Sequence, residues 1–136
     1  MFRKDLDIFT ELGVSLGVAG VLADMGGSFL ALGNDAEAGR IWREALHIAT
    51  DIHATPVALE ALAGFASLQA KQGDREYALE LLLIVLNHPA SYQETKNRAS
   101  GLRAELEAQL TSSQCEATQT HAGEKTFEAV VGDLLK

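Results

Sequence analysis

Cysteine, proline and aromatic residues are scarce in this sequence. Of its 136 residues one is cysteine, two are proline, and 6% are aromatic. A single cysteine excludes an intramolecular disulfide framework and any metal site built from several cysteines. The low number of prolines, in a chain rich in alanine and leucine, favours a helical protein.

Positive charge is scarce as well. Lysine and arginine number 11 against 19 aspartate and glutamate residues, which gives a formal net charge of -8. An acidic chain lacks the electrostatic footprint of a protein that binds a nucleic-acid backbone, so we expect no nucleic-acid partner. Lys96, Arg98 and Arg103 are interleaved with acidic residues, which is typical of a solvated helix face. The length and the 47% hydrophobic content suit one globular domain.

Apolar residues recur every three to four positions without strand-like alternation, so the sequence predicts an all-α fold. Glycine, asparagine, aspartate and proline mark the ends of the helices. We expect helices at about 4–12, 14–32, 35–51, 55–71, 75–86, 91–110 and 127–135. Gly13 is the predicted stop of the first helix, and Asp35 is the predicted N-cap of the third. The polar segment 111–123 is predicted to be a mobile linker before a short helix in residues 124–136.

A repeat is the strongest signal in the sequence. Gly33 and Gly73 lie 40 residues apart, and each is followed by an asparagine or aspartate in a turn between two predicted helices. A helix, a Gly-Asn or Gly-Asp turn and a second helix make up each unit, and this unit length is typical of solenoid repeats. The two units are expected at about 14–53 and 55–89.

The two units resemble tetratricopeptide repeats, whose signature is Trp-x2-Leu-Gly-x2-Tyr, then Ala-x3-Phe, then Pro. Leu22 and Leu62 stand where the signature has its leading Trp, and Gln69 stands at the second aromatic position. Small residues match where paired helices approach, and larger ones match between them: Gly26, Phe29, Ala38 and Trp42, then Phe65, Ala66, Ala78 and Leu82. The resemblance implies an antiparallel helix-hairpin array, a TPR-like α-solenoid in residues 1–110 with a capping helix at 91–110.

The resemblance also implies a function. Tetratricopeptide arrays typically present the first helix of each pair on a concave side, where a partner segment docks. The residues that this places in the partner-binding groove are Asp24, Gly27, Ser28, Ala31, Ala63, Ser67, Ala70 and Lys71. Segments 6–20 and 88–110 further resemble the helical arrays of bacterial multi-domain signalling ATPases and LuxR-type transcriptional regulators. We therefore expect a cytoplasmic, non-catalytic protein–protein interaction module, either the C-terminal part of such a bacterial regulator or a small relative of one.

Candidate catalytic residues do not converge on a site. His47 and His53 flank Asp51, but their spacing of six residues puts them on different faces of a helix. Cys115 and His121 lie in the polar segment, which offers no fixed geometry for a nucleophile and its base. The glycines form no phosphate-binding loop. We expect no enzyme activity, no cofactor and no metal, although an enzyme with an unrecognised site stays a third, disfavoured class.

The apolar stretch 12–33 is long enough to span a bilayer, but Asp24 near its centre would cost on the order of 3 kcal/mol. A tightly packed helix is the preferred interpretation, with Asp24 either an exposed carboxylate or a polar contact in the groove. Two repeat units cannot bury their own open ends. Leu6, Phe9 and Leu12 at the N-terminal end are therefore expected to be covered by a second copy, by residues 127–135, or by an upstream domain. Homodimerisation through the exposed repeat ends is the alternative function.

Overall fold

The computed structural model describes the backbone of residues 2–136 and the side chains of residues 11–136. Within this range the chain is all-α, as the apolar periodicity predicts, and contains no strand. Its helices are α1 (Phe2–Ala31), α2 (Asp35–Asp51), α3 (Thr55–Lys71), α4 (Arg75–Asn87), α5 (Gln93–Gln109), α6 (Ser112–Gly123) and α7 (Phe127–Leu134). Most boundaries fall within two residues of those expected from the turn-forming residues.

Two of the predicted local features are wrong. Gly13 does not end a helix, because α1 runs through it, and Gly13 is not among the residues with the positive φ of a glycine cap. Residues 112–123 form α6 where a mobile linker was expected. Thr111 and Gln114 make a capping box there, with each side chain accepting a hydrogen bond from the other residue's amide, at 3.1 and 2.9 Å. This local cap allows a polar segment to begin a helix.

The repeated glycines form matching turns. Gly33 (φ 83°) follows α1 and Gly73 (φ 94°) follows α3, both in the left-handed region that favours glycine. In each turn the next residue's amide donates to a carbonyl five residues earlier, at 2.9 Å, which is the Schellman arrangement. Asn34 and Asp74 then cap α2 and α4 with their side chains. The N-cap of α2 is therefore Asn34, and the expectation that Asp35 fills this position is wrong.

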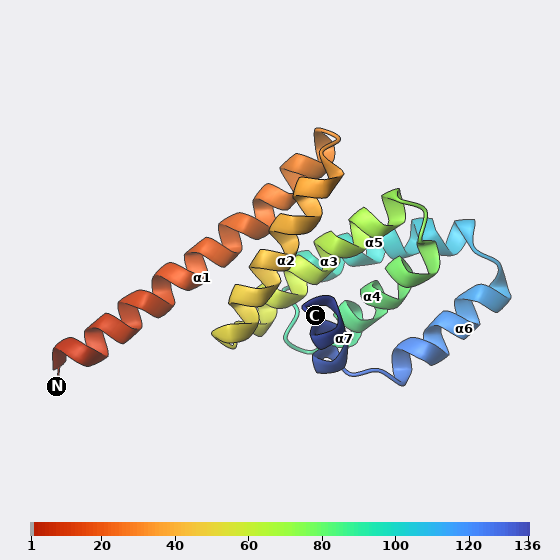
Figure 1. Ribbon diagram of the computed structural model, residues 1–136. Helices are drawn as coiled ribbons and strands as arrows, with labels where there is room; N and C mark the ends of the chain where they lie inside the picture. Colours follow the sequence, from red (N-terminus) through yellow and green to blue (C-terminus); the bar gives the residue numbers. More distant parts are fainter. Residues whose placement is uncertain (1) are drawn as a thin grey trace.

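Consecutive helices pack side by side from α1 to α5, and three alternate ones, α1, α3 and α5, also touch in a row (Figure 1). Short turns of three residues between α1 and α4 make these neighbours antiparallel. The helix α4 is apolar nearly all round, and α3, α5 and α6 pack against it. The core is dominated by leucine and small residues; its largest fully buried side chains are Leu46, Leu59, Leu62, Leu79, Leu81, Leu82, Leu106 and Val85.

The buried Trp42 fixes how closely α1, α2 and α3 approach. Its ring lies against Gly26 on α1 and Gly64 on α3, where an added Cβ would come within 2.4 and 2.3 Å of the indole. The indole N–H donates to the carbonyl of Ala23 at 3.0 Å. Of the residues expected to pack the repeat, only Phe29 is half-exposed, and the others are buried: Gly26, Ala38, Trp42, Phe65, Ala66, Ala78 and Leu82.

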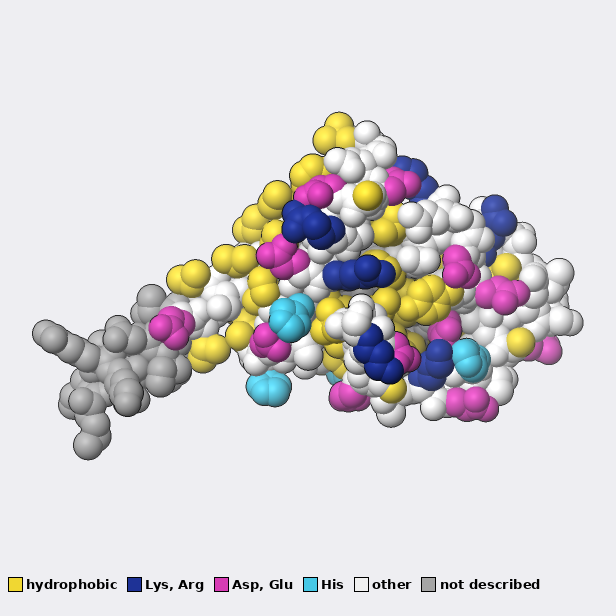
Figure 2. Space-filling model, viewed as in Figure 1, with side chains coloured by type: hydrophobic (Ala, Val, Ile, Leu, Met, Phe, Trp, Pro, Cys, Tyr) yellow, Lys and Arg dark blue, Asp and Glu magenta, His cyan; other side chains and the backbone are white. Residues whose placement is uncertain are grey.

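The first half of α1 extends away from the other helices (Figure 1). Figure 2 shows hydrophobic side chains along the described part of this helix. Between residues 12 and 25 of α1, six large apolar side chains are 39–61% exposed: Leu12, Val14, Leu16, Val18, Val21 and Met25. The expected covering by residues 127–135 is wrong, because α7 buries Val130 and Val131 elsewhere in the core, and Phe127 meets the ring of His88. The side chains of Leu6 and Phe9 lie outside the described residues.

Candidate functional site: a cavity between α1, α3 and α5

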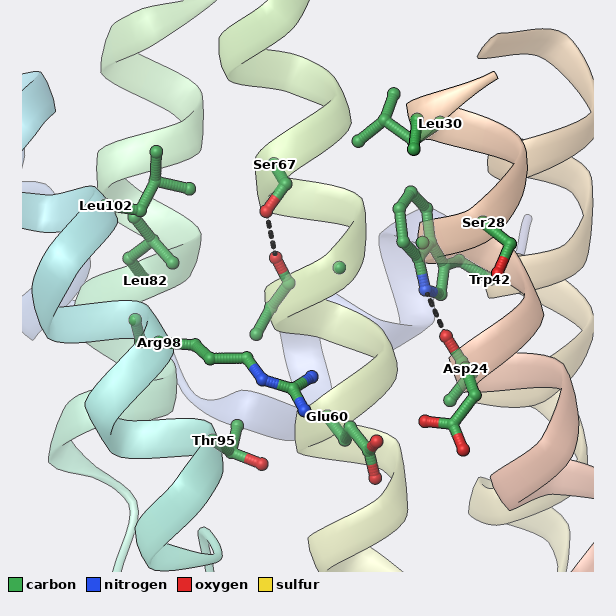
Figure 3. Close-up of a pocket in the computed structure, with 16 residues that line it drawn as sticks. Asp24, Ser28, Leu30, Trp42, Glu60, Ser67, Leu82, Thr95, Arg98 and Leu102 are labelled. Atoms are coloured by element: carbon green, nitrogen blue, oxygen red, sulfur yellow. Dashed lines mark hydrogen bonds between the residues drawn. The ribbon is translucent and has the colours of Figure 1, made fainter. Parts of the chain in front are cut away.

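A cavity of about 480 Å³ lies between the alternate helices α1, α3 and α5, and we call it the α1–α3–α5 cavity. Trp42 from α2 and Leu82 from α4 also line it (Figure 3). The remaining lining residues are Ala23, Asp24, Gly27, Ser28, Leu30, Ala31, Glu60, Ala63, Gly64, Ser67, Thr95, Arg98, Ala99 and Leu102. Several of them are exposed, so that solvent reaches the cavity.

Small residues make the room between α1 and α3. Gly27 and Ala31 face the cavity from α1, and Ala63 and Ser67 face it from α3. A Cβ added to Gly27 would meet nothing within 4 Å. The hydroxyl of Ser67 donates to the carbonyl of Ala63 at 3.3 Å, within its own helix. The cavity therefore has small, mostly apolar walls in which a longer side chain can lie.

Charged side chains gather at one end of the cavity. Asp24 from α1, Glu60 from α3 and Arg98 from α5 lie around this end (Figure 3). Burial, and secondly the charge of Asp24, raises the pKa of Glu60 above its usual range, and Arg98 opposes this shift. Arg98 is already paired with Glu94, from Nη2 to Oε1 at 2.5 Å. The two acidic groups are thus only partly balanced.

Six of the eight residues that the sequence places in a groove line this cavity: Asp24, Gly27, Ser28, Ala31, Ala63 and Ser67. Ala70 and Lys71 lie outside it. The ammonium of Lys71 instead contacts Asp35 Oδ1 at 2.7 Å and the carbonyl of Leu30 at 3.3 Å. Lys71 thus connects α3 with the end of α1 and the start of α2.

Sequence reasoning missed the α5 wall, namely Thr95, Arg98, Ala99 and Leu102, and it missed Glu60 on α3. The segment 91–110 was interpreted only as a capping helix. Ala99, Leu102 and Leu106 share an apolar spine in the sequence, and this spine indicates which face of α5 turns inward. If α5 continues the row of alternate helices formed by α1 and α3, this inward face becomes the third wall of the cavity.

A second group of ionisable residues holds α6 against α4. The Oε1 atom of the buried Glu80 lies 2.8 Å from Lys125 Nζ and 3.1 Å from His121 Nδ1. Glu80 raises the pKa of Lys125, and this contact outweighs the opposing effect of burial. Sequence reasoning did not single out Glu80, because a glutamate within an apolar helix carries no motif. His121 therefore faces α4, and Cys115 is half-buried on α6.

Residues 11–136 contain no group of three or more histidine, cysteine, aspartate or glutamate side chains placed to hold a metal ion. His47 pairs with Asp51 at 3.4 Å on an exposed face of α2. In comparisons with known proteins, no family model, curated protein or solved structure matches the chain. The chemistry of the cavity must therefore be argued from its own residues.

Proposed function

We propose that this protein is a non-catalytic interaction module that binds a segment of a partner protein in the α1–α3–α5 cavity. The observation that carries the proposal is the cavity itself, about 480 Å³ between three alternate helices and lined largely by small residues. A volume of this size is typical of sites that enclose several side chains or a small ligand. Six residues expected to bind a partner line it together.

The order of packing supports a TPR-like array. Successive helices pair, and the first helices of the pairs, α1 and α3, lie in one row with α5. In tetratricopeptide proteins this row is the side that receives partner segments. The resemblance to arrays of bacterial signalling ATPases and LuxR-type regulators supports a regulatory role in the cytoplasm as part of the same proposal.

A pair of matched substitutions tests this function. Ser67→Trp fills the cavity, whereas Ser100→Trp adds the same side chain to an exposed position of α5 outside it. We expect wild type and Ser100→Trp to retain the same protein from an extract of the source cells, and Ser67→Trp to lose it. Circular dichroism and the melting temperature check that both variants fold. Equal retention by all three proteins, or retention by none, contradicts the proposal.

Self-assembly is a second candidate function, and the exposed face of α1 favours it. Four side chains at 4-3-4 spacing form one stripe along the helix: Val14, Val18, Val21 and Met25. This spacing is that of the seam through which two helices pack as a coiled coil. A second copy of the chain presents the same stripe, so the two can cover each other.

A membrane span is a less favoured use of α1. Glu11–Ala31 is long and apolar enough to cross a bilayer, with a mean hydropathy of 1.5. Its second half, however, packs against α2 and α3. Ala19 and Ala23 are buried there, and the indole N–H of Trp42 donates to the Ala23 carbonyl. Insertion would break these contacts, so we expect the helix to pack against protein.

A further inference from the structure

The charged end of the α1–α3–α5 cavity indicates what kind of side chain it accepts. Asp24 and Glu60 approach this end from two helices, and the third charged group there, Arg98, already pairs with Glu94 at 2.5 Å. With Glu94 counted, the charged groups around this end comprise three carboxylates and one guanidinium. An additional positive charge is therefore favoured at this place, and an additional negative charge is repelled.

The rest of the cavity is suited to apolar side chains. Ala63, Leu82, Ala99 and Leu102 line it beside the charged end. A free amine or a small cation would occupy the carboxylate end alone and leave these apolar walls in contact with water. A protein segment can fill both parts, because lysine and arginine carry an apolar stem and apolar residues can follow them in the sequence.

We propose that the α1–α3–α5 cavity binds a partner segment through a lysine or arginine whose charge lies between the carboxylates of Asp24 and Glu60. Apolar residues next to this basic residue fill the remainder of the cavity. The inference rests on the proposed function, and it adds the chemistry of the partner. A basic segment is also drawn to the chain as a whole, since the formal net charge is -8.

Selection from a library of random dodecapeptides displayed on phage tests the inference. The baits are wild type, Ser67→Trp, the double variant Asp24→Asn/Glu60→Gln, and a control double variant Glu105→Gln/Glu116→Gln. The control removes two exposed glutamates outside the cavity and changes the net charge by the same amount. We expect wild type and control to enrich peptides with a basic residue flanked by apolar ones, and the other two baits not to do so.

The outcomes separate the inference from the proposed function. If enrichment depends on an open cavity but shows no preference for a basic residue, the inference is overturned and the proposed function stands. If wild type and Ser67→Trp enrich the same peptides, both are overturned. Enrichment of basic peptides that is equal in Asp24→Asn/Glu60→Gln and in the control also overturns the inference.

Trp42 provides a second measurement on a selected peptide. It is the only tryptophan in the chain and lines the cavity, so a segment that enters should change its fluorescence. We expect Asp24→Asn/Glu60→Gln to weaken binding by roughly tenfold or more, and replacing the peptide's basic residue by norleucine to weaken it similarly. Once the carboxylates are removed, the norleucine exchange should have little further effect. Independent, additive losses would contradict a direct contact between them.

Discussion

Trp42 lies between Gly26 and Gly64, and a Cβ at either position would force the indole or a helix to shift. An added Cβ at Gly64 would come within 2.3 Å of the indole, whose N–H is held by the carbonyl of Ala23. The tetratricopeptide signature predicted Gly26 as a site of close approach because it fills the signature's glycine position. Gly64 matches no position of that signature, and only the packing of α3 against Trp42 reveals its role.

We expect Gly64→Ala to lower the free energy of unfolding by about 1–2 kcal/mol. Overpacking a core typically costs about 1–3 kcal/mol, and the better helix propensity of alanine offsets up to about 1 kcal/mol of this. Gly101→Ala is the matched control, because a Cβ there meets nothing within 4 Å and the helix propensity alone should stabilise it. Urea unfolding followed by circular dichroism measures both, and equal stabilities would refute the close contact.

Glu60 predicts a pH dependence of stability. Burial, and then the charge of Asp24, raises its pKa in the folded protein above the usual 4.5. Protonation of Glu60 therefore contributes stability that is fully present below pH 4.5 and is lost as the pH rises through the folded-state pKa. Glu60→Gln should be more stable than wild type at pH 7, and this difference should vanish below pH 4.5. Chemical unfolding between pH 4 and pH 7 measures the free energy of unfolding of both proteins. A difference that does not change with pH, or an equally large difference for the exposed control Glu105→Gln, would contradict a raised pKa of Glu60.

Helices are the scale at which the sequence was most informative. Gly33 and Gly73 predicted the turns from α1 to α2 and from α3 to α4, because positive φ is a local property. Asp74 was correctly predicted to cap α4, whereas the cap of α2 is Asn34 and not Asp35. The same local reasoning failed at Gly13, since glycine is tolerated inside a helix when no turn follows it. It also failed for α6, because the polarity of residues 111–123 predicts a linker, whereas Thr111 and Gln114 form a capping box that begins a helix. The cavity's α5 wall needed tertiary packing, which no local signal contains.

The docking of α6 on α4 should depend on Glu80. Its buried carboxylate lies 2.8 Å from the ammonium of Lys125 and also contacts His121, without a well-aligned hydrogen bond. We expect Glu80→Gln to destabilise the protein by about 1–2 kcal/mol. This loss is smaller than that for breaking a fully buried ion pair, because Lys125 and His121 are partly exposed. Hydrogen exchange should quicken in α6 and stay unchanged in α2. Glu76→Gln, at an exposed position of the same helix, is the control, and an equal effect there would exclude this role.

At the scale of the whole molecule, the exposed half of α1 is the feature that packing inside one chain leaves unexplained. Leu12, Leu16, Ala19 and Ala23 follow one another at 4-3-4 spacing and so lie on one face of α1. Ala19 and Ala23 are buried, whereas Leu12 and Leu16 on the same face are exposed. The first half of α1 extends past the other helices (Figure 1), and Leu12 and Leu16 are 42% and 45% exposed. Monomeric proteins rarely leave so continuous an apolar surface uncovered. The sequence predicts that a second copy, residues 127–135 or an upstream domain covers this surface. Residues 127–135 pack elsewhere, so a second copy or an upstream domain remains.

If a second copy covers α1, the mass of the protein in solution should depend on its concentration. Val14→Glu/Val21→Glu places two charges on one stripe, seven residues apart, and should leave a monomer at concentrations where wild type is dimeric. Leu32→Glu is the control, because it adds a negative charge at an exposed leucine that lies beyond the end of α1 and outside the stripe. Sedimentation equilibrium over a wide concentration range distinguishes the three proteins. If wild type stays monomeric at every concentration, self-assembly is excluded. The stripe of Val14, Val18, Val21 and Met25 would then be expected to contact a different domain or a partner protein.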